Sequence, residues 1–204
     1  MNRISDLTRR LWAALLALCL VLALTLPVFA EGESGTAVQD TAPKDTVYLS
    51  SADDLIQLAK NCRLDSWSKN RTVYLDADLE LTGSGFAGIP SFSGVFEGQG
   101  HTISGLSLVD DGSVIGFFRY VQQGAVVQNL TVKASVGPSD RKNEVAAIAG
   151  SNSGIIRQCA AQGGVKGGDS VGGVVGVNEL TGQVINCTFS GSVTGEHYVG
   201  GIAG

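Results

Sequence analysis

Three acidic side chains near the middle of the sequence have the type and spacing of a cation site. Asp76, Asp78 and Glu80 alternate with apolar residues, so a strand would place all three carboxylates on one face. Oxygen ligands of this kind suit a hard cation such as calcium. A solvated, charged strand face that discourages the addition of further strands explains the same pattern. We favour this second interpretation and predict no metal site.

The histidines and the remaining acids do not form a catalytic pattern. His101 and His197 are the only histidines, and neither an HExxH motif nor a pair of CxxC motifs is present. We interpret His101, in EGQGHTISG, as part of a turn before a strand. The acids after Asp111 do not share an equivalent position in any repeat; they are Asp140, Glu144, Asp169, Glu179 and Glu196. The sequence therefore predicts no enzyme activity and no catalytic or cofactor-binding residue.

A repeat of 26 to 29 residues positions these side chains from about residue 112 onward. The segments VAAIAG, VGGVVG and VGGIAG begin at Val145, Val171 and Val199, and a second block of the type GQVINCTFS recurs with them. Each unit contains two short β-branched segments separated by Gly, Asn and Ser, which are too short for the helices of an α-solenoid. The repeat predicts an all-β fold, a right-handed parallel β-helix with a short N-terminal strand-helix-strand cap.

Stacking of the coils would place equivalent residues directly above one another, in rows inside the β-helix. The predicted rows are Val145, Val171 and Val199; Ile148, Val174 and Ile202; Leu130, Cys159 and Cys187; and Val136, Val165 and Val193. We interpret the glycines as corner residues, where φ is positive or backbones approach closely. Cys159 and Cys187 would be near enough to bond, and we favour two reduced thiols that act as small apolar groups.

Three segments precede the repeats. Residues 1–30 have a basic start, an apolar run and small residues up to Ala30, which predicts a signal peptide cleaved after Ala30. Residues 31–46 are small and polar and predict a flexible leader. Residues 47–82 predict the cap, with a helix over 52–61 that begins after Ser50 or Ser51, and one strand over 73–81. Residues 83–204 are assigned to the β-helix, which we expect to be truncated at its C-terminus.

Several of these strings resemble the GLUG-repeat proteins. They are FSGVFEGQGHTISGLSL, IGFF, VGGVVGVN and VGGIAG. The resemblance implies a bacterial cell-surface or adhesin-like protein built on a glycine-rich β-helix. The same motif occurs in the N-terminal region of some immunoglobulin A-cleaving metallopeptidases. It is an architectural element, so it indicates the fold more specifically than the function.

The sequence predicts a secreted or cell-surface module for adhesion, display or spacing, exported through the general secretory pathway. Its net charge of −5 argues against nucleic acid as a partner, and no membrane association is expected after signal cleavage. The expected partners are an extracellular glycan or a host or cell-surface protein, with further coils or downstream domains if the chain is a fragment. Two alternatives remain: a carbohydrate-active β-helix enzyme, and the non-catalytic N-terminal region of a larger surface metallopeptidase. Trp67, Tyr74 and Tyr120 do not recur with the repeat period, so no aromatic glycan-binding patch is predicted.

Overall fold

The computed structural model describes residues 45–109, 112–138 and 142–204. The predicted signal peptide lies outside the described residues, as does the predicted leader apart from Asp45 and Thr46. No helix among the described residues is long and apolar enough to cross a membrane.

Within the described residues, parallel strands form four sheets, which we name A to D. Sheet A contains, in spatial order, β1 (Thr46–Leu49), β2 (Thr72–Leu75), β5 (Val95–Glu97), β8 (Val126–Gln128), β12 (Ile155–Arg157) and β16 (Gln183–Ile185). Sheet B contains β3 (Leu79–Glu80), β6 (Thr102–Leu108), β9 (Thr131–Val136), β13 (Ala160–Lys166) and β17 (Thr188–Thr194). Sheet C contains β4 (Ile89–Phe92), β7 (Phe118–Val121), β11 (Ala149–Asn152) and β15 (Val175–Asn178). Sheet D contains β10 (Val145–Ala146), β14 (Asp169–Gly172) and β18 (His197–Gly200).

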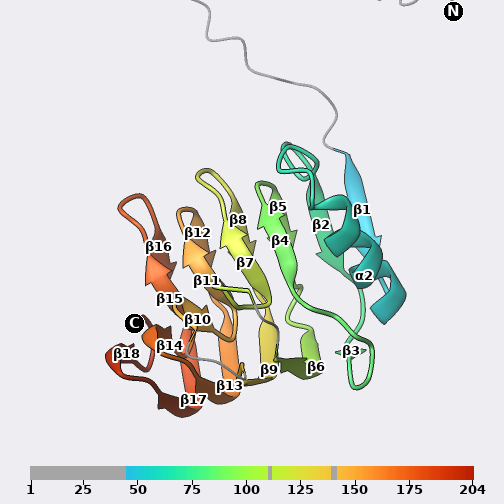
Figure 1. The fold of residues 1–204 in the computed structure, drawn as a ribbon. Helices are drawn as coiled ribbons and strands as arrows, with labels where there is room; N and C mark the ends of the chain where they lie inside the picture. The colour runs from blue at the N-terminus through green and yellow to red at the C-terminus, as the bar shows by residue number, and fades with distance from the viewer. Residues whose placement is uncertain (1–44, 110–111, 139–141) are drawn as a thin grey trace, which may run out of the picture. The chain divides into compact units, whose positions relative to one another are not determined.

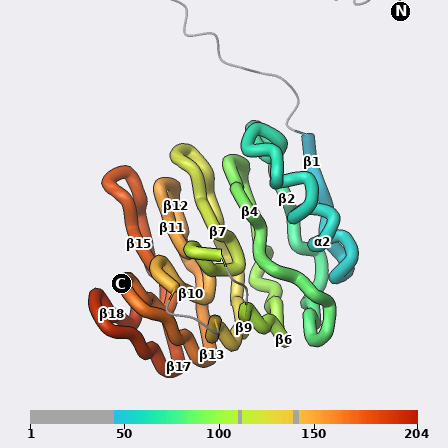
Figure 2. Tube along the Cα trace, viewed as in Figure 1, coloured from blue at the N-terminus to red at the C-terminus, as the bar shows by residue number. Residues whose placement is uncertain are grey.

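From β8 onward the chain visits these sheets in a fixed cycle, whereas the two coils before it pass from sheet B to sheet C without a described strand in sheet D. After β8 in sheet A it passes through β9 in sheet B, β10 in sheet D and β11 in sheet C, and then returns to sheet A as β12. Strands of successive coils lie side by side in chain order, from the blue end to the red end of the ribbon (Figure 1), and the tube follows the same path (Figure 2). The predicted fold class, a parallel β-helix with a strand-helix-strand start, is confirmed.

Between β1 and β2 the chain forms the helix α2 (Ala52–Asn61) and no strand of sheets B, C or D. Its N-cap is Ser51, whose Oγ accepts a hydrogen bond from the Asp54 N–H at 3.2 Å. The Ser51 hydroxyl in turn donates to the Asp54 carboxylate, and this bond is the main cause of the lowered pKa of Asp54. Leu55 and Leu58 are fully buried and close the N-terminal end of the core. The predicted helix is confirmed, with Ser51 as its cap.

The four predicted interior rows are confirmed by the strand register. Val171 pairs with Val145 and Val199, and Val165 pairs with Val136 and Val193. In the row of Val174, the Ile148 N–H donates to the Val174 carbonyl and the Val174 N–H donates to the Ile202 carbonyl. Pairing of Ala160 with Thr131 and Thr188 places Cys159 between Leu130 and Cys187. Members in the earlier coils are fully buried, whereas Val199 and Ile202 in the last coil are partly exposed.

The single strand predicted over residues 73–81 is wrong. The chain forms β2 in sheet A and β3 in sheet B, with a corner at residues 76–78. Burial still alternates through this corner, because Val73, Leu75 and Leu79 are buried while Asp76 and Asp78 are exposed. The alternation shows which side chains point inward. In a β-helix the strands on both sides of a corner face the same core, so the alternation continues through the corner.

The glycine interpretation is confirmed: glycines such as Gly100 and Gly124 have positive φ, and others are required by close approach. Positive φ recurs at two corner rows that contain no glycine: Asn129, Gln158 and Asn186, and Glu144, Ser170 and Tyr198. Glycines inside the VGGVVG-type segments are required by close approach. A Cβ added to Gly172 would lie 1.9 Å from the Val175 carbonyl oxygen. Residues other than glycine therefore also hold positive-φ corners, and the prediction of close backbone contact is confirmed.

Candidate functional site

The carboxylates of residues 76–80 bind the following coil. Asp76 accepts a hydrogen bond from Gln99 Nε2 at 2.8 Å, and Asp78 accepts one from the Thr102 N–H at 2.8 Å. Glu80 accepts from Ser104 Oγ at 2.7 Å. The Thr102 N–H, followed by His101, lowers the pKa of Asp78. The three acids are exposed, as the favoured interpretation expects, and they also tie two coils together.

Each histidine pairs with an aspartate of the preceding coil. His101 Nδ1 lies 3.0 Å from Asp78 Oδ1, and His197 Nδ1 lies 2.7 Å from Asp169 Oδ1. His101 directly precedes β6, as predicted. Across residues 45–109, 112–138 and 142–204, no group of three or more His, Cys, Asp or Glu side chains is placed to hold a metal ion.

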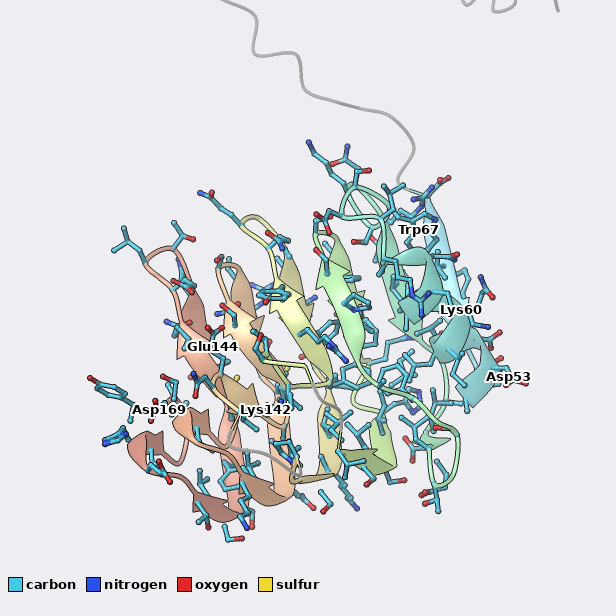
Figure 3. All side chains as sticks on the ribbon, viewed as in Figure 1. Asp53, Lys60, Trp67, Lys142, Glu144 and Asp169 are labelled. Atoms are coloured by element: carbon cyan, nitrogen blue, oxygen red, sulfur yellow. The ribbon has the colours of Figure 1, made fainter. Side chains whose placement is uncertain are left out.

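The fold brings together acids that occupy different repeat positions. Glu144 and Asp169 lie in neighbouring coils, where the Glu144 N–H donates to the Asp169 carbonyl at 3.2 Å (Figure 3). Burial, and then the negative charge of Glu179, raise the pKa of Glu144. Glu179 accepts a hydrogen bond from Ser151 Oγ at 3.1 Å. Glu144 and Glu179 occupy different positions in the repeat, so the repeat pattern did not predict that they lie near each other. Asp140 lies outside the described residues.

A polar network crosses three coils on the outer face of sheet A. Glu97 accepts hydrogen bonds from Gln128 Nε2 at 2.6 Å and Asn129 Nδ2 at 2.9 Å, and from the Gln99 N–H at 2.8 Å. Arg157 Nε donates to Gln128 Oε1 at 2.6 Å. Burial alone would raise the pKa of Glu97, but these bonds together lower it. The network borders an open groove of about 650 Å³.

A pair of tyrosines extends the same outer face and was missed in the sequence. Tyr48 and Tyr74 are in register on β1 and β2, and their rings stack with centroids 5.6 Å apart. Tyr48 is 61% exposed. The prediction that aromatic residues do not recur with the repeat period is therefore wrong for this pair of tyrosines. The signal was the identical tetrapeptide TVYL, which occurs at residues 46–49 and again at 72–75.

The two stacked cysteines are free thiols, as predicted. Cys159 is buried and Cys187 is partly exposed. Contact between the two thiols raises the pKa of Cys159 and lowers that of Cys187. Each sulfur also lies near a backbone carbonyl of its own coil, that of Arg157 for Cys159 and that of Ile185 for Cys187, so the thiols pack as small polarisable groups inside the corner.

Comparison with known proteins supports the architecture. Residues 167–194 match the family model of the GLUG motif. The chain is similar to halomucin of Haloquadratum walsbyi (strain DSM 16790 / HBSQ001), with 30% identity over 171 residues and 72% of the chain covered. The chain spans 2% of the length of halomucin. No solved structure matches it. The predicted resemblance to GLUG-repeat proteins is thus confirmed: the chain is a parallel β-solenoid that carries a GLUG motif in the coil from β14 to β17.

Proposed function

We propose that the chain is a non-catalytic extracellular module that serves adhesion, display or spacing. The observation that carries the proposal is the outward row Glu97, Gln128 and Arg157, whose side chains bind one another across successive coils. Such rows fix the outer face at strand spacing, about 4.8 Å for each coil. The GLUG motif and the similarity to halomucin support a role in a large repetitive protein.

A stack of coils is mechanically suited to this role. Each coil of a solenoid contacts only its neighbours, so length can grow by addition of coils without a change in the core. Here the carboxylates of Asp76, Asp78 and Glu97 all bind the next coil. These hydrogen bonds give the three carboxylates a structural role at the surface. They support a scaffold function rather than an active site.

We expect Glu97→Gln to weaken the scaffold. The substitution removes the charged acceptor and sets an amide N–H₂ against Asn129, at a cost of about 1 to 2 kcal/mol in the free energy of unfolding. The folded-state pKa of Glu97 is depressed, so its contribution is present above the unfolded pKa of about 4.3 and is lost as pH falls through the folded value. Urea unfolding at neutral and acid pH tests both points. A destabilisation that persists unchanged at a pH where Glu97 is protonated would contradict this explanation.

Export is expected to remove the first thirty residues. The small side chains before the predicted site fit the peptidase, so the secreted protein should begin at Glu31. N-terminal sequencing of secreted material measures this directly. Intact protein that still carries Met1 in the membrane fraction would show a retained anchor instead.

One experiment distinguishes the non-catalytic module from the carbohydrate-active enzyme. Beads coated with the purified protein are passed over plant, mucin and bacterial polysaccharide surfaces, and each polysaccharide is then examined for shortened or unsaturated products. We expect retention on at least one surface and intact polysaccharide throughout. Among the described residues, the pair Glu144 and Glu179 is the one that favours the enzyme alternative, so Glu144→Gln is the diagnostic variant. Product formation that disappears in Glu144→Gln would replace the proposed function by a catalytic one.

A further inference from the structure

A pocket of about 370 Å³ lies between α2 and the loop that leads into β4. This volume is of the size that holds a small ligand. One wall comes from Ile56, Ala59 and Lys60, which follow the spacing of residues on one face of α2, and from Arg63 in the turn after the helix. The opposite wall comes from residues 85–90 and from Arg119 on β7.

The loop wall is held in place by packing. The Phe86 ring is buried against Phe117, with centroids 5.4 Å apart. Gly88 has φ +95°, and a Cβ there would lie 2.6 Å from the Gly116 carbonyl oxygen, so the loop is pressed against the coil behind it. Arg119 Nη2 donates to the Ala87 carbonyl at 3.2 Å, which fixes this guanidinium over the loop. The pocket is therefore preformed.

The charges around the pocket have one sign. Among the described residues, Lys60, Arg63 and Arg119 line it and no acid does, although the chain as a whole carries a net charge of −5. Lys60 and Arg63 are exposed, and neither has an ion-pair partner within the described residues. Figure 3 shows Lys60 on α2. Between the cations, Ile56, Ala59 and Pro90 provide an apolar surface.

We propose that this pocket binds the acidic sugar residue of an extracellular glycan. The carboxylate of a uronic acid would bind Lys60 and Arg63 through charge-assisted hydrogen bonds, and the C–H face of its ring would cover Ile56 and Pro90. The inference rests on the proposed adhesive function and names a ligand class for it. A basic pocket on an acidic protein selects such a ligand from neutral sugars by charge complementarity.

Titration calorimetry with trigalacturonate tests the proposal, with maltotriose as the neutral trisaccharide and pentaglutamate as the acidic peptide. We expect the purified protein to bind trigalacturonate with Kd below about 1 mM and to bind the other two at least tenfold more weakly. The variant Lys60→Gln/Arg63→Gln should raise the Kd for trigalacturonate about tenfold or more. The control Lys69→Gln/Lys133→Gln changes net charge equally outside the pocket and should shift it less than about twofold.

Equal losses of trigalacturonate affinity in the two double variants would show that overall charge explains the binding, and would overturn the proposal. Pentaglutamate that binds as tightly as trigalacturonate would overturn it in favour of an acidic peptide. Absence of trigalacturonate binding would also overturn it, and retention of the coated beads on another surface would then show that the adhesive function survives without this ligand. Both substituted side chains are exposed, so unchanged thermal unfolding is expected and distinguishes lost binding from lost folding.

Discussion

Val174→Asp should destabilise the C-terminal coils by about 3 to 5 kcal/mol, because it places an unpaired charge in a sealed apolar row. Val174 is fully buried, with Ile148 in the coil before it and Ile202 in the coil after it. The described residues around it offer no charged partner for the new carboxylate in this row. Solenoid units contact only their neighbours, so the loss should be local. Urea unfolding followed by the far-ultraviolet β signal should show an early transition for the coils after Gly112 and a later one for the N-terminal coils.

Glu179→Gln is the matched control in the same coil. Glu179 is exposed just after β15, and its substitution should change the free energy of unfolding by less than about 0.5 kcal/mol. Equal stability of Val174→Asp and Glu179→Gln would mean that the assignment of the interior row is wrong.

Gly176→Ala should cost about 3 kcal/mol, although it adds only one methyl group. The new Cβ would lie 2.6 Å from the carbonyl carbon of Glu144 and 2.6 Å from the carbonyl oxygen of Gly150. Both contacts are with backbone, which cannot rotate away as a side chain can. Thermal unfolding of the variant and of the unmodified protein measures the difference.

Gly137→Ala provides the comparison. No atom of the described residues lies within 4 Å of a Cβ at Gly137, and its φ is not in the left-handed region, so alanine should be neutral or slightly stabilising. If Gly176→Ala proved as mild as Gly137→Ala, the close packing of the VGGVVG segments would be refuted.

The repeat made the interior of this fold predictable. Residues such as Val145, Val171 and Val199 are equivalent in sequence because they are stacked in space, so their spacing alone gives the register. The helix was predictable for a local reason, since Ser51, Asp54 and the apolar face are all within one short segment.

Corners and outer surfaces were harder to predict. One positive-φ corner is formed by Asn129, Gln158 and Asn186, where no glycine marks the conformation in the sequence. The pocket beside α2 joins Lys60 to Arg119, which are in different elements and share no repeat position. The pair Glu144 and Glu179 was hard to predict for the same reason, because the turns of the coil bring together residues from different repeat positions.

Hydrogen-bond scalar couplings between backbone amides and carbonyls, measured by NMR, test the stacked parallel coils most directly. The structure predicts that the Thr131 N–H is bonded to the His101 carbonyl, the Ala160 N–H to the Leu130 carbonyl, and the Thr188 N–H to the Cys159 carbonyl. Couplings across these three pairs would establish one register through four successive coils. Couplings that instead join these amides to an antiparallel partner, or to residues shifted along the strand, would contradict the β-solenoid and every surface derived from it.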